Sequence, residues 1–484
     1  MTLMMDRRAL LGSAMLAGLT VIAPDQALAG AAPADWTLGV ADIDADIPPA
    51  AMTRVAGRAP AGLAGTLYRN GPAKFRRAGG ASGHWFDGDG LVRKFTLGAG
   101  GATLAARFVD TPKRRLETSL DSIVIPGFGT NRGKGAVLSG PDDANAANTS
   151  VLMSGGELLA LWEAGSPARL DPETLATRGF KTFRDDLAHM PFLAHPRVAP
   201  DGTVWNLGAS GDQCIVWKLA PGGTLAKAEV IKLPRASYFH DFTATARHLV
   251  IVLQPWLQEH DSFPLSTGLA WRPEKGTQVL VIDKDDLSKR RLFELPAFVF
   301  FHLDDAWEEA DGTIRFNGAF ESDPTFGQRT AAGLIRGEFI RAPRPVLSQV
   351  VLHANGRADL MASGIAAEFL TNDKRFAGVA RRRSAHVTHY RDMPFPHGIG
   401  MWDNNTGRDD AFDFGSDQLV EEFVFAPRGA EESDGWLIGT TLNLKARATE
   451  LHVLDARRAS AGPVASWRAA MPLPLTFHGI FVGA

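Results

Sequence analysis

Short apolar runs, each ended by a turn signal, recur along most of this chain. Nine of them are GTLYRNGP (65–72), LVRKFTL (91–97), ELLALWEAG (157–165), TVWNLGAS (203–210), HLVIVLQPW (248–256), QVLVIDKDD (278–286), GTIRFNG (312–318), GWLIGTTLN (435–443) and TELHVLDA (449–456). Their lengths, and the Asp-Gly, Asn-Gly and Lys-Asp-Asp turns among them, are typical of antiparallel strands joined by hairpins. Long helical periodicities are few, and 50 glycines and 29 prolines add further turns. The pattern predicts an all-β protein.

The strands are too irregularly spaced for a simple repeat of forty-odd residues. A β-propeller with long insertions is still compatible with them, because seven blades of four strands would use only about 150 residues. The remaining residues could form loops that roof one face of the ring. The stretch richest in Gly, Ala and Asn, residues 127–148, is expected to be one such loop rather than a domain linker.

The N-terminus has the features of an export signal. Arg7-Arg8 precede an apolar run that ends near Ala23 and is too short and too broken by glycine and serine to span a bilayer comfortably. Ala27-Leu28-Ala29 then offers a small-residue cleavage site. We interpret residues 1–29 as a twin-arginine-like signal peptide and residues 30–484 as a single periplasmic domain. A general secretory signal and a cytoplasmic protein are the alternatives.

Charge and cysteine content restrict the chemistry. The 51 basic and 54 acidic residues leave a net charge of −3, so no basic excess points to nucleic acid as a partner. Cys214 is the single cysteine, which excludes an internal disulfide and any multi-cysteine metal cluster within this chain. A metal site would therefore be built from histidines and carboxylates.

Four histidines, His195, His240, His302 and His478, lie in or beside apolar, strand-like runs. They are separated by 45, 62 and 176 residues, so a single helix or hairpin cannot bring them together and a closed, ring-like fold is required. Four neutral imidazoles would form an iron site without a protein anion among its ligands, which suits dioxygen chemistry better than hydrolysis. The alternative for each is an ordinary buried histidine.

Several further motifs carry a resemblance to a known family. They are Tyr68-Arg69-Asn70-Gly71-Pro72, His84-Trp85-Phe86-Asp87-Gly88-Asp89-Gly90, Ala147-Asn148-Thr149, Leu161-Trp162-Glu163, Leu170-Asp171-Pro172-Glu173-Thr174-Leu175 and Phe477-His478-Gly479. With the four histidine segments, these motifs resemble the carotenoid cleavage oxygenases, which include apocarotenoid and stilbene-cleaving dioxygenases and the isomerase of the retinal pigment epithelium. The resemblance extends from about residue 38 to the C-terminus.

This resemblance implies a seven-bladed β-propeller capped by a dome of loops and short helices. It also implies one iron(II) per chain, held by the four histidines named above. Glu163, Glu368 and Glu422 match glutamates that orient the ligating imidazoles in the family. Loss of such a partner typically lowers metal affinity or activity by about 10- to 100-fold. Thr149 matches a residue over a vacant coordination site; the alternative is a turn residue that bonds its own backbone.

The function that the resemblance implies is dioxygen-dependent cleavage of a carbon–carbon double bond in an apolar, conjugated substrate. Both atoms of O₂ would enter the cleaved bond and give two carbonyl products. Family members that cleave stilbenes engage a phenol with a tyrosine and a lysine, and residues 107–111 and 142–145 show no counterpart. A carotenoid or apocarotenoid polyene is therefore favoured over an aromatic alkene such as a stilbene. A tunnel mouth with peripheral membrane contact is a further expectation.

Two alternatives stay open. One is a non-enzymatic periplasmic propeller that binds a ligand, and the other is an isomerase that keeps the iron site without cleaving its substrate. Among the other histidines, His386 and His389 are predicted to lie on a solvated edge strand. His84 is assigned to a structural turn in which glycines adopt positive φ and aspartates bond backbone amides.

Overall fold

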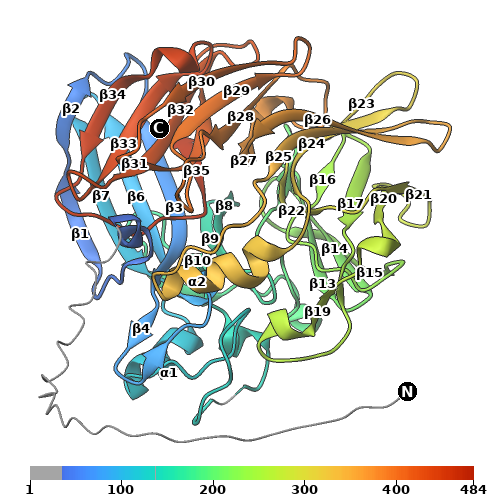
Figure 1. Cartoon of the computed structure of the whole chain (residues 1–484), viewed down its shortest axis with the longest axis horizontal. Helices are drawn as coiled ribbons and strands as arrows, with labels where there is room; N and C mark the ends of the chain where they lie inside the picture. The colour runs from blue at the N-terminus through green and yellow to red at the C-terminus, as the bar shows by residue number, and fades with distance from the viewer. Residues whose placement is uncertain (1–34, 137) are drawn as a thin grey trace, which may run out of the picture. The chain divides into compact units, whose positions relative to one another are not determined.

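Seven antiparallel sheets arranged in a ring make up most of the structure (Figure 1). The computed structural model describes residues 35–136 and 138–484, so the predicted signal peptide lies outside the described residues. Asp35–Ala484 forms one compact unit. The seven-bladed propeller expected from the resemblance is confirmed, and each of the nine predicted segments contains a strand.

Five blades follow one another along the chain. Within each of them the strands lie in chain order from the inner to the outer edge of the blade. They are β8 (Ser150–Ser154), β9 (Glu157–Leu161), β10 (Ala168–Leu170) and β11 (Thr177–Phe180); β12 (Arg197–Val198), β13 (Val204–Ser210), β14 (Gln213–Leu219) and β15 (Leu225–Lys232); β16 (Thr243–Ala244), β17 (His248–Leu253), β20 (Thr277–Asp283) and β21 (Arg290–Leu295); β22 (Val299–Leu303), β24 (Ile314–Glu321), β25 (Val346–Leu352) and β26 (Ala358–Ala366); and β27 (Glu368–Thr371), β28 (Arg383–Thr388), β29 (Gly398–Asp403) and β30 (Arg408–Asp413). The short β23 (Trp307–Glu308) pairs with β24.

The other two blades close the ring, because each combines strands from both ends of the chain. They are β35 (His478–Gly483), β3 (Gly65–Lys74), β6 (Asp89–Gly98), β7 (Gly101–Phe108) and β1 (Ile47–Ala51); and β31 (Gln418–Pro427), β32 (Gly435–Asn443), β33 (Ala448–Asp455), β34 (Pro463–Arg468) and β2 (Thr53–Gly57). The last strand pairs with the third in a register that sets Asn70 opposite His478. The C-terminal histidine is thus held in place by an N-terminal strand.

Apolar side chains fill the spaces between blades. One cluster joins three consecutive blades through residues such as Val216, Val250 and Phe316, all fully buried. Burial on both faces explains why several strands, such as β17, are nearly continuous apolar runs.

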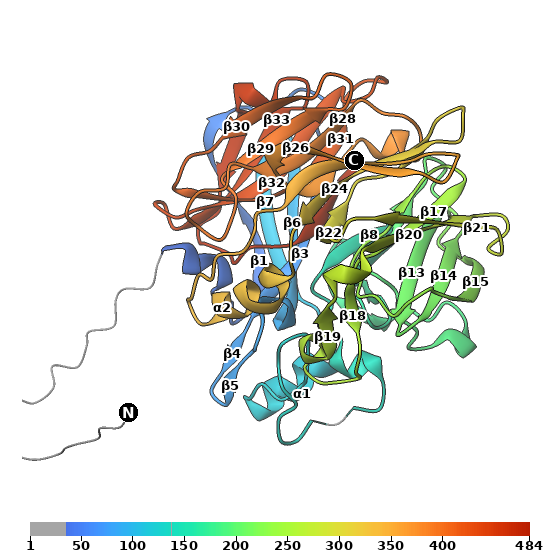
Figure 2. The same cartoon turned by 45° about the vertical axis from the view of Figure 1, so that its right-hand side comes forward.

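A cap of short elements lies on one side of the sheets. Figures 1 and 2 show α1, β4 and β19 gathered there. Its elements are β4 (Arg76–Arg77), β5 (Gly80–Ala81), α1 (Pro112–Leu120), β18 (Trp256–Gln258), β19 (Leu269–Trp271) and α2 (Ala331–Ile335). Further short helices occur along the whole chain: η1 (Asp35–Val40), η2 (Trp85–Asp87), η3 (Pro141–Ala144), η4 (Asp185–Leu187), η5 (Leu265–Gly268), η6 (Pro273–Lys275), η7 (Phe326–Thr330), η8 (Lys374–Phe376) and η9 (Ala459–Ala461). None of the helices described between residues 35 and 484 is both long and apolar enough to cross a membrane.

Two local predictions need correction. The segment around His386 is not a solvated edge strand, because β28 lies between β27 and β29 and Ser384–Thr388 are buried. Its polar side chains misled the prediction: Ser384 donates to Asp304, and Thr388 donates to the carbonyl of Ala366 at 2.8 Å. Polar residues can thus be buried where partners are supplied.

The GHWFDGDG block is structural, as expected, but for a different reason. Asp87 does accept from the backbone amides of Phe128 and Gly129, at 2.7 and 2.9 Å. The glycines of this block do not need positive φ, however, since Gly88 has φ −66°. Gly90 is required by close approach, because a Cβ there would lie 2.2 Å from the carbonyl oxygen of Ala147.

Candidate metal centre and its cavity

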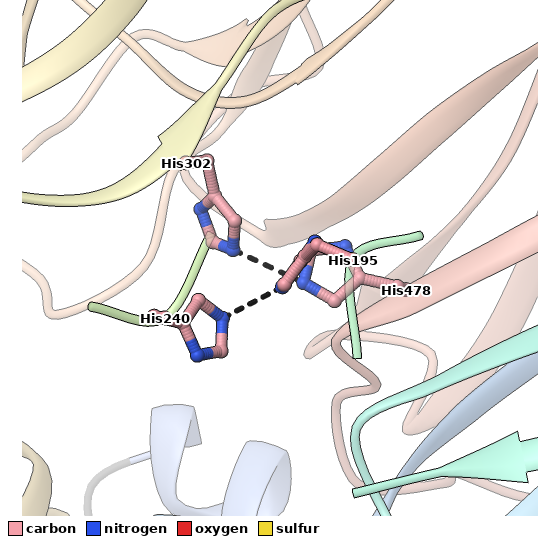
Figure 3. Close-up of side chains that lie close together, drawn as sticks. All are labelled: His195, His240, His302 and His478. Atoms are coloured by element: carbon pink, nitrogen blue, oxygen red, sulfur yellow. Dashed lines mark hydrogen bonds between the residues drawn. The ribbon is translucent and has the colours of Figure 1, made fainter. Parts of the chain in front are cut away.

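The four predicted histidines are gathered in one cluster (Figure 3). His302 lies on β22 and His478 begins β35, while His195 and His240 lie just before the inner strands β12 and β16. Each comes from a different blade. The structure therefore brings together residues that are up to 283 positions apart in the sequence.

The ring nitrogens of these residues face one another. Nε2 of His195 lies 2.8 Å from Nε2 of His240, and Nε2 of His302 lies 3.0 Å from Nε2 of His478. The four ligand atoms all lie within 4.8 Å of one another. The structure thus contains a four-histidine cluster of metal-binding geometry.

Each of the three predicted glutamates bonds the outward-facing nitrogen of one histidine. Glu163 bonds Nδ1 of His240, Glu368 bonds Nδ1 of His302, and Glu422 accepts from Nδ1 of His478 at 3.0 Å. A carboxylate at Nδ1 keeps the proton on that nitrogen and leaves the Nε2 lone pair directed at the centre of the cluster.

All seven blades contribute to this arrangement. The four histidines come from four blades, and the glutamates come from the other three: Glu368 begins β27, Glu422 lies on β31, and Glu163 follows β9 by two residues. The position of each imidazole therefore depends on strands from at least two blades, except for His195, whose Nδ1 is not bonded by one of these glutamates.

Electrostatics favours neutral imidazoles at two positions. Burial and then the neighbouring imidazoles lower the pKa of His195 well below its ordinary value. Burial likewise lowers the pKa of His478 to about 4, against the opposing effect of Glu422. At His302 burial is the largest effect and lowers the pKa, but the carboxylates of Glu368, Asp241 and Glu422 together raise it more, so the net pKa is raised. The Glu368 carboxylate thus favours positive charge at this imidazole, whether a proton or a metal cation carries it.

The donor set fits a transition metal. Three of the four imidazoles present acceptor nitrogens to one another, since their Nδ1 atoms are engaged by carboxylates, and acceptors cannot bond one another without a cation between them. Neutral imidazole is a ligand for iron, zinc, copper and nickel. Arg69 pairs with the Glu422 carboxylate, so the Glu163 and Glu368 carboxylates remain to balance the charge of a divalent ion.

A cavity of about 800 Å³ lies beside the histidine cluster. Its wall includes His240, His302 and His478 and is otherwise rich in aromatic rings. The rings are those of Trp85, Phe86, Phe128, Trp162, Tyr238, Phe239, Phe263, Phe301, Phe326, Phe339, Phe369, Tyr390, Phe395 and Phe477. The cavity therefore suits a largely apolar molecule placed against the metal centre.

Comparison with known proteins places the chain in a family. The model of the retinal pigment epithelial membrane protein family matches residues 41–483. The chain belongs to this family, that of the carotenoid cleavage oxygenases. The apocarotenoid-15,15′-oxygenase of Synechocystis is 27% identical, over 92% of this chain and 94% of that protein. Lignostilbene-α,β-dioxygenase isozyme III of Sphingomonas paucimobilis is 26% identical, over 89% and 93%.

Solved structures support the fold of this family member. The structure of the cobalt-substituted Synechocystis apocarotenoid oxygenase superposes with a TM-score of 0.84 and 24% identity. The match covers 94% of this chain and 99% of that one. The resemblance stated from the sequence motifs is therefore confirmed, and so is the propeller that it implied.

Three contributors to the centre of this carotenoid cleavage oxygenase were missed by sequence reasoning. The hydroxyl of Tyr238 donates to Glu163 at 3.3 Å, and fully buried Arg69 donates to Glu422 at 2.8 Å. Phe369 stacks on His302, with ring centroids 4.8 Å apart. The one available signal was that Tyr238 lies two residues before His240, on the same face of an extended segment.

Phe369 has a strained backbone. Its φ of +51° is unusual for an aromatic residue, and it lies where the β27–β28 register shifts. This conformation turns its amide onto Glu368, to which it donates at 2.7 Å. The strain is thus offset by a bond that holds the glutamate against His302.

Thr149 lines the cavity and is buried. Its hydroxyl donates to the side-chain oxygen of Asn148 at 3.1 Å, and Asn148 in turn donates to the carbonyls of Phe86 and Gly88. The position is compatible with contact to a ligand in the cavity, and the neighbouring asparagine fixes the rotamer.

Proposed function

We propose that this protein is an iron(II)-dependent dioxygenase that cleaves a carbon–carbon double bond of an apolar, conjugated alkene to two carbonyl products. One observation carries the proposal: the histidine cluster forms part of the wall of a cavity lined mainly by hydrocarbon. Family membership supports it, because the matched relatives are named as oxygenases of apocarotenoids and lignostilbenes. A ligand-binding propeller would not need four converging imidazoles.

His195, His240, His302 and His478 would hold the iron. When bound, iron(II) supplies the binding and activation of O₂. With two oxygen atoms added to one double bond, the reaction balances without an external reductant. Because none of the four predicted ligands is a carboxylate, the ligands themselves leave the charge of the ion undiminished.

The side chains of the cavity position the substrate and limit water. Trp162, Phe301 and Phe477 are part of the wall together with three of the histidines, so they can hold an alkene next to the metal centre by apolar contact. A dry cavity also protects activated oxygen from side reactions. Thr149 is proposed to restrict which ligand occupies the open side of the centre, because it is buried and faces the same cavity.

A polyene, carotenoid or apocarotenoid, is the preferred substrate class, with a stilbene-type aromatic alkene as the second candidate. The preference has structural support, because the described residues of the cavity wall include no lysine to engage a phenol. Tyr238, one of its two tyrosines, already donates to Glu163.

Isotope labelling tests the reaction. Iron-loaded protein is incubated under ¹⁸O₂ with a panel of apocarotenoids and hydroxystilbenes, and products are trapped within seconds because aldehydes exchange oxygen with water. A parallel run in H₂¹⁸O under ¹⁶O₂ measures that exchange. We expect one ¹⁸O in each carbonyl fragment. An uncleaved geometric isomer would instead favour an isomerase, and recovery of unaltered bound substrate would favour a ligand-binding propeller.

The location is proposed from the N-terminal residues. Arg7-Arg8 and the following apolar run support export to the periplasm in a folded, metal-loaded state. Contact with a membrane surface at the cavity mouth is supported by Phe263, which lines the cavity and is 61% exposed.

A further inference from the structure

A buried carboxyl group in the cavity wall has no assigned partner. Glu321 ends β24 and is only 4% exposed, and it forms part of the wall of the same cavity as the histidine cluster. No hydrogen bond from the described residues reaches its Oε2. Buried polar atoms are nearly always bonded, so an unbonded one that borders a cavity points to a bond with a ligand.

Two other polar residues, Tyr390 and Arg344, line the same cavity as Glu321. The Arg344 guanidinium carbon lies 4.8 Å from the centre of the Tyr390 ring, and its Nη2 donates to the carbonyls of Arg391 and Met393 at 2.8 and 2.9 Å. Arg344 is therefore held in place by backbone groups and supports the tyrosine ring by stacking.

Most other acidic groups of the wall are already engaged. Glu368 bonds His302, Glu163 bonds His240, and Asp87 accepts from two backbone amides. Within the described residues, neither the hydroxyl of Tyr390 nor Oε2 of Glu321 makes a hydrogen bond to the protein. Both groups therefore have capacity left for a ligand.

The charge state of Glu321 suits a neutral ligand. Burial raises its pKa well above the ordinary value, and the nearby Glu368 carboxylate raises it further, while Arg344 opposes this. Burial also raises the pKa of the Tyr390 hydroxyl well above its ordinary value. A carboxyl group kept neutral by an apolar site can donate a hydrogen bond as well as accept one.

We propose that Glu321 and Tyr390 bind an oxygen atom at one end of the substrate, so that the substrate is a conjugated alkene with a terminal hydroxyl, aldehyde or ketone group. This inference rests on the proposed function and narrows its substrate class. Anchoring one end of a long conjugated molecule would determine which double bond lies at the metal centre.

The chemistry also predicts that the site discriminates between substrates with and without an oxygen terminus. A hydrocarbon of the same shape would leave Glu321 and Tyr390 unbonded in a dry site, whereas an oxygen terminus would bond both. Sites built to hydrogen-bond a substrate reject analogues without the bonding group more strongly than apolar pockets reject a missing methylene. Loss of one such bond is expected to weaken binding about tenfold.

Binding without turnover tests the inference. Iron-loaded protein is kept free of oxygen, and quenching of tryptophan fluorescence is titrated with two matched pairs of probes. The pairs are all-trans-retinal with its parent hydrocarbon axerophthene, and 4-hydroxystilbene with trans-stilbene. The first pair tests an aldehyde terminus and the second a phenol. Glu321→Leu and Tyr390→Phe are compared with the wild type, and Glu338→Gln, at an exposed site, is the control.

We expect each cavity variant to bind at least one oxygenated probe about tenfold more weakly than the wild type does, with the affinity for its hydrocarbon partner unchanged. Equal affinities in wild type and variants, or an equal loss for both members of each pair, would overturn the proposal. Tyr390→Phe removes only one oxygen atom from a partly exposed residue, so it remains informative if Glu321→Leu fails to fold. Because the assay needs no O₂, failure of this inference is distinguishable from failure of the cleavage reaction.

Discussion

Nε2 of His302 lies 3.0 Å from Nε2 of His478, although 176 residues separate them. The two residues lie on inner strands of different blades, β22 and β35, and β35 is held by its pairing with β3 near the other end of the chain. The short distance between them therefore depends on closure of the whole ring. Metal binding is expected to report on the intact propeller rather than on a local segment.

Substitution of a predicted ligand should remove the metal. His240→Ala deletes one of the four imidazoles and leaves Glu163 with a single described side-chain partner, Tyr238. We expect iron content, measured by inductively coupled plasma mass spectrometry, to fall from near one atom per chain to a small fraction of that. His260→Ala, at an exposed site outside the cluster, is the matched control. Unaltered iron content in His240→Ala would show that the ligand assignment is wrong.

Substitution of a carboxylate that bonds one of the histidines should lower metal affinity or activity almost as much as substitution of a predicted ligand. Burial raises the pKa of Glu422, but His478 and Arg69 lower it more, so it is an anion that accepts from both. Glu422→Gln keeps the shape and removes the charge, and we expect about a 10- to 100-fold loss of metal affinity or activity. Competition with a chelator measures this affinity. Glu431→Gln, at an exposed residue, should have no effect.

The strands and the ring were accessible from the sequence because burial on both faces gives continuous apolar runs ended by turns. The nine predicted segments all contain strands, and the separate apolar run around His302 is also a strand, β22. The histidines were assigned jointly through their apolar surroundings and through the family motifs. Spacing alone gave no reason to choose His195 over His386.

Other features depended on contacts that no local pattern encodes. β28 looked like an edge strand because its polar residues find partners only in the folded ring, as Ser384 does with Asp304. The positive φ of Phe369 falls at a bulge in a segment without glycine at that position. Glu321 is the last residue of an ordinary strand, and its position in the cavity wall became evident only from the three-dimensional structure.

A buried ion cluster in the cap offers a test of stability. Lys113, on α1, donates to Asp89 at 2.8 Å and to Glu117 at 2.9 Å, and all three side chains are almost fully buried. Lys113→Met would leave Glu117 buried without this cation, and we expect the free energy of unfolding to fall by about 3–5 kcal/mol. Urea denaturation measures it. Lys227→Met breaks a more exposed pair with Glu229 and should cost no more than about 1 kcal/mol.

The same cluster predicts a pH dependence. Burial raises the pKa of Asp89, but Lys113 and the neighbouring arginines lower it more, so its pKa in the folded state is below the ordinary 3.8. Such a carboxylate contributes stability above its ordinary pKa, and this contribution is lost as the pH falls through the lowered value. The stability difference between wild type and Lys113→Met should therefore be full at pH 7 and narrow below pH 3.8. A difference that grows on acidification would contradict this assignment.

Membrane contact at the cavity mouth can be tested at one residue. Phe263 is the most exposed of the large apolar side chains in the described part of the chain and also lines the cavity. Phe263→Asn should weaken binding to phosphatidylcholine vesicles by about fivefold or more, as judged by sedimentation. Val230→Asn, on the outer strand β15 and 54% exposed, provides the comparison. Equal binding by both variants would mean that Phe263 does not enter the membrane.

The proposed export signal makes a prediction that separates two routes. A twin-arginine signal depends on the arginine pair itself, whose planar guanidinium groups lysine does not reproduce, whereas a general secretory signal requires only positive charge ahead of an apolar run. Arg7→Lys with Arg8→Lys keeps that charge. We expect the double variant to accumulate in the cytoplasm with residues 1–29 uncleaved, while the wild type is recovered from the periplasm and begins at Gly30. Fractionation and mass spectrometry of the intact protein measure both properties. Continued export of the double variant would favour the general secretory route, and the chain would then cross the membrane unfolded and bind its metal afterwards.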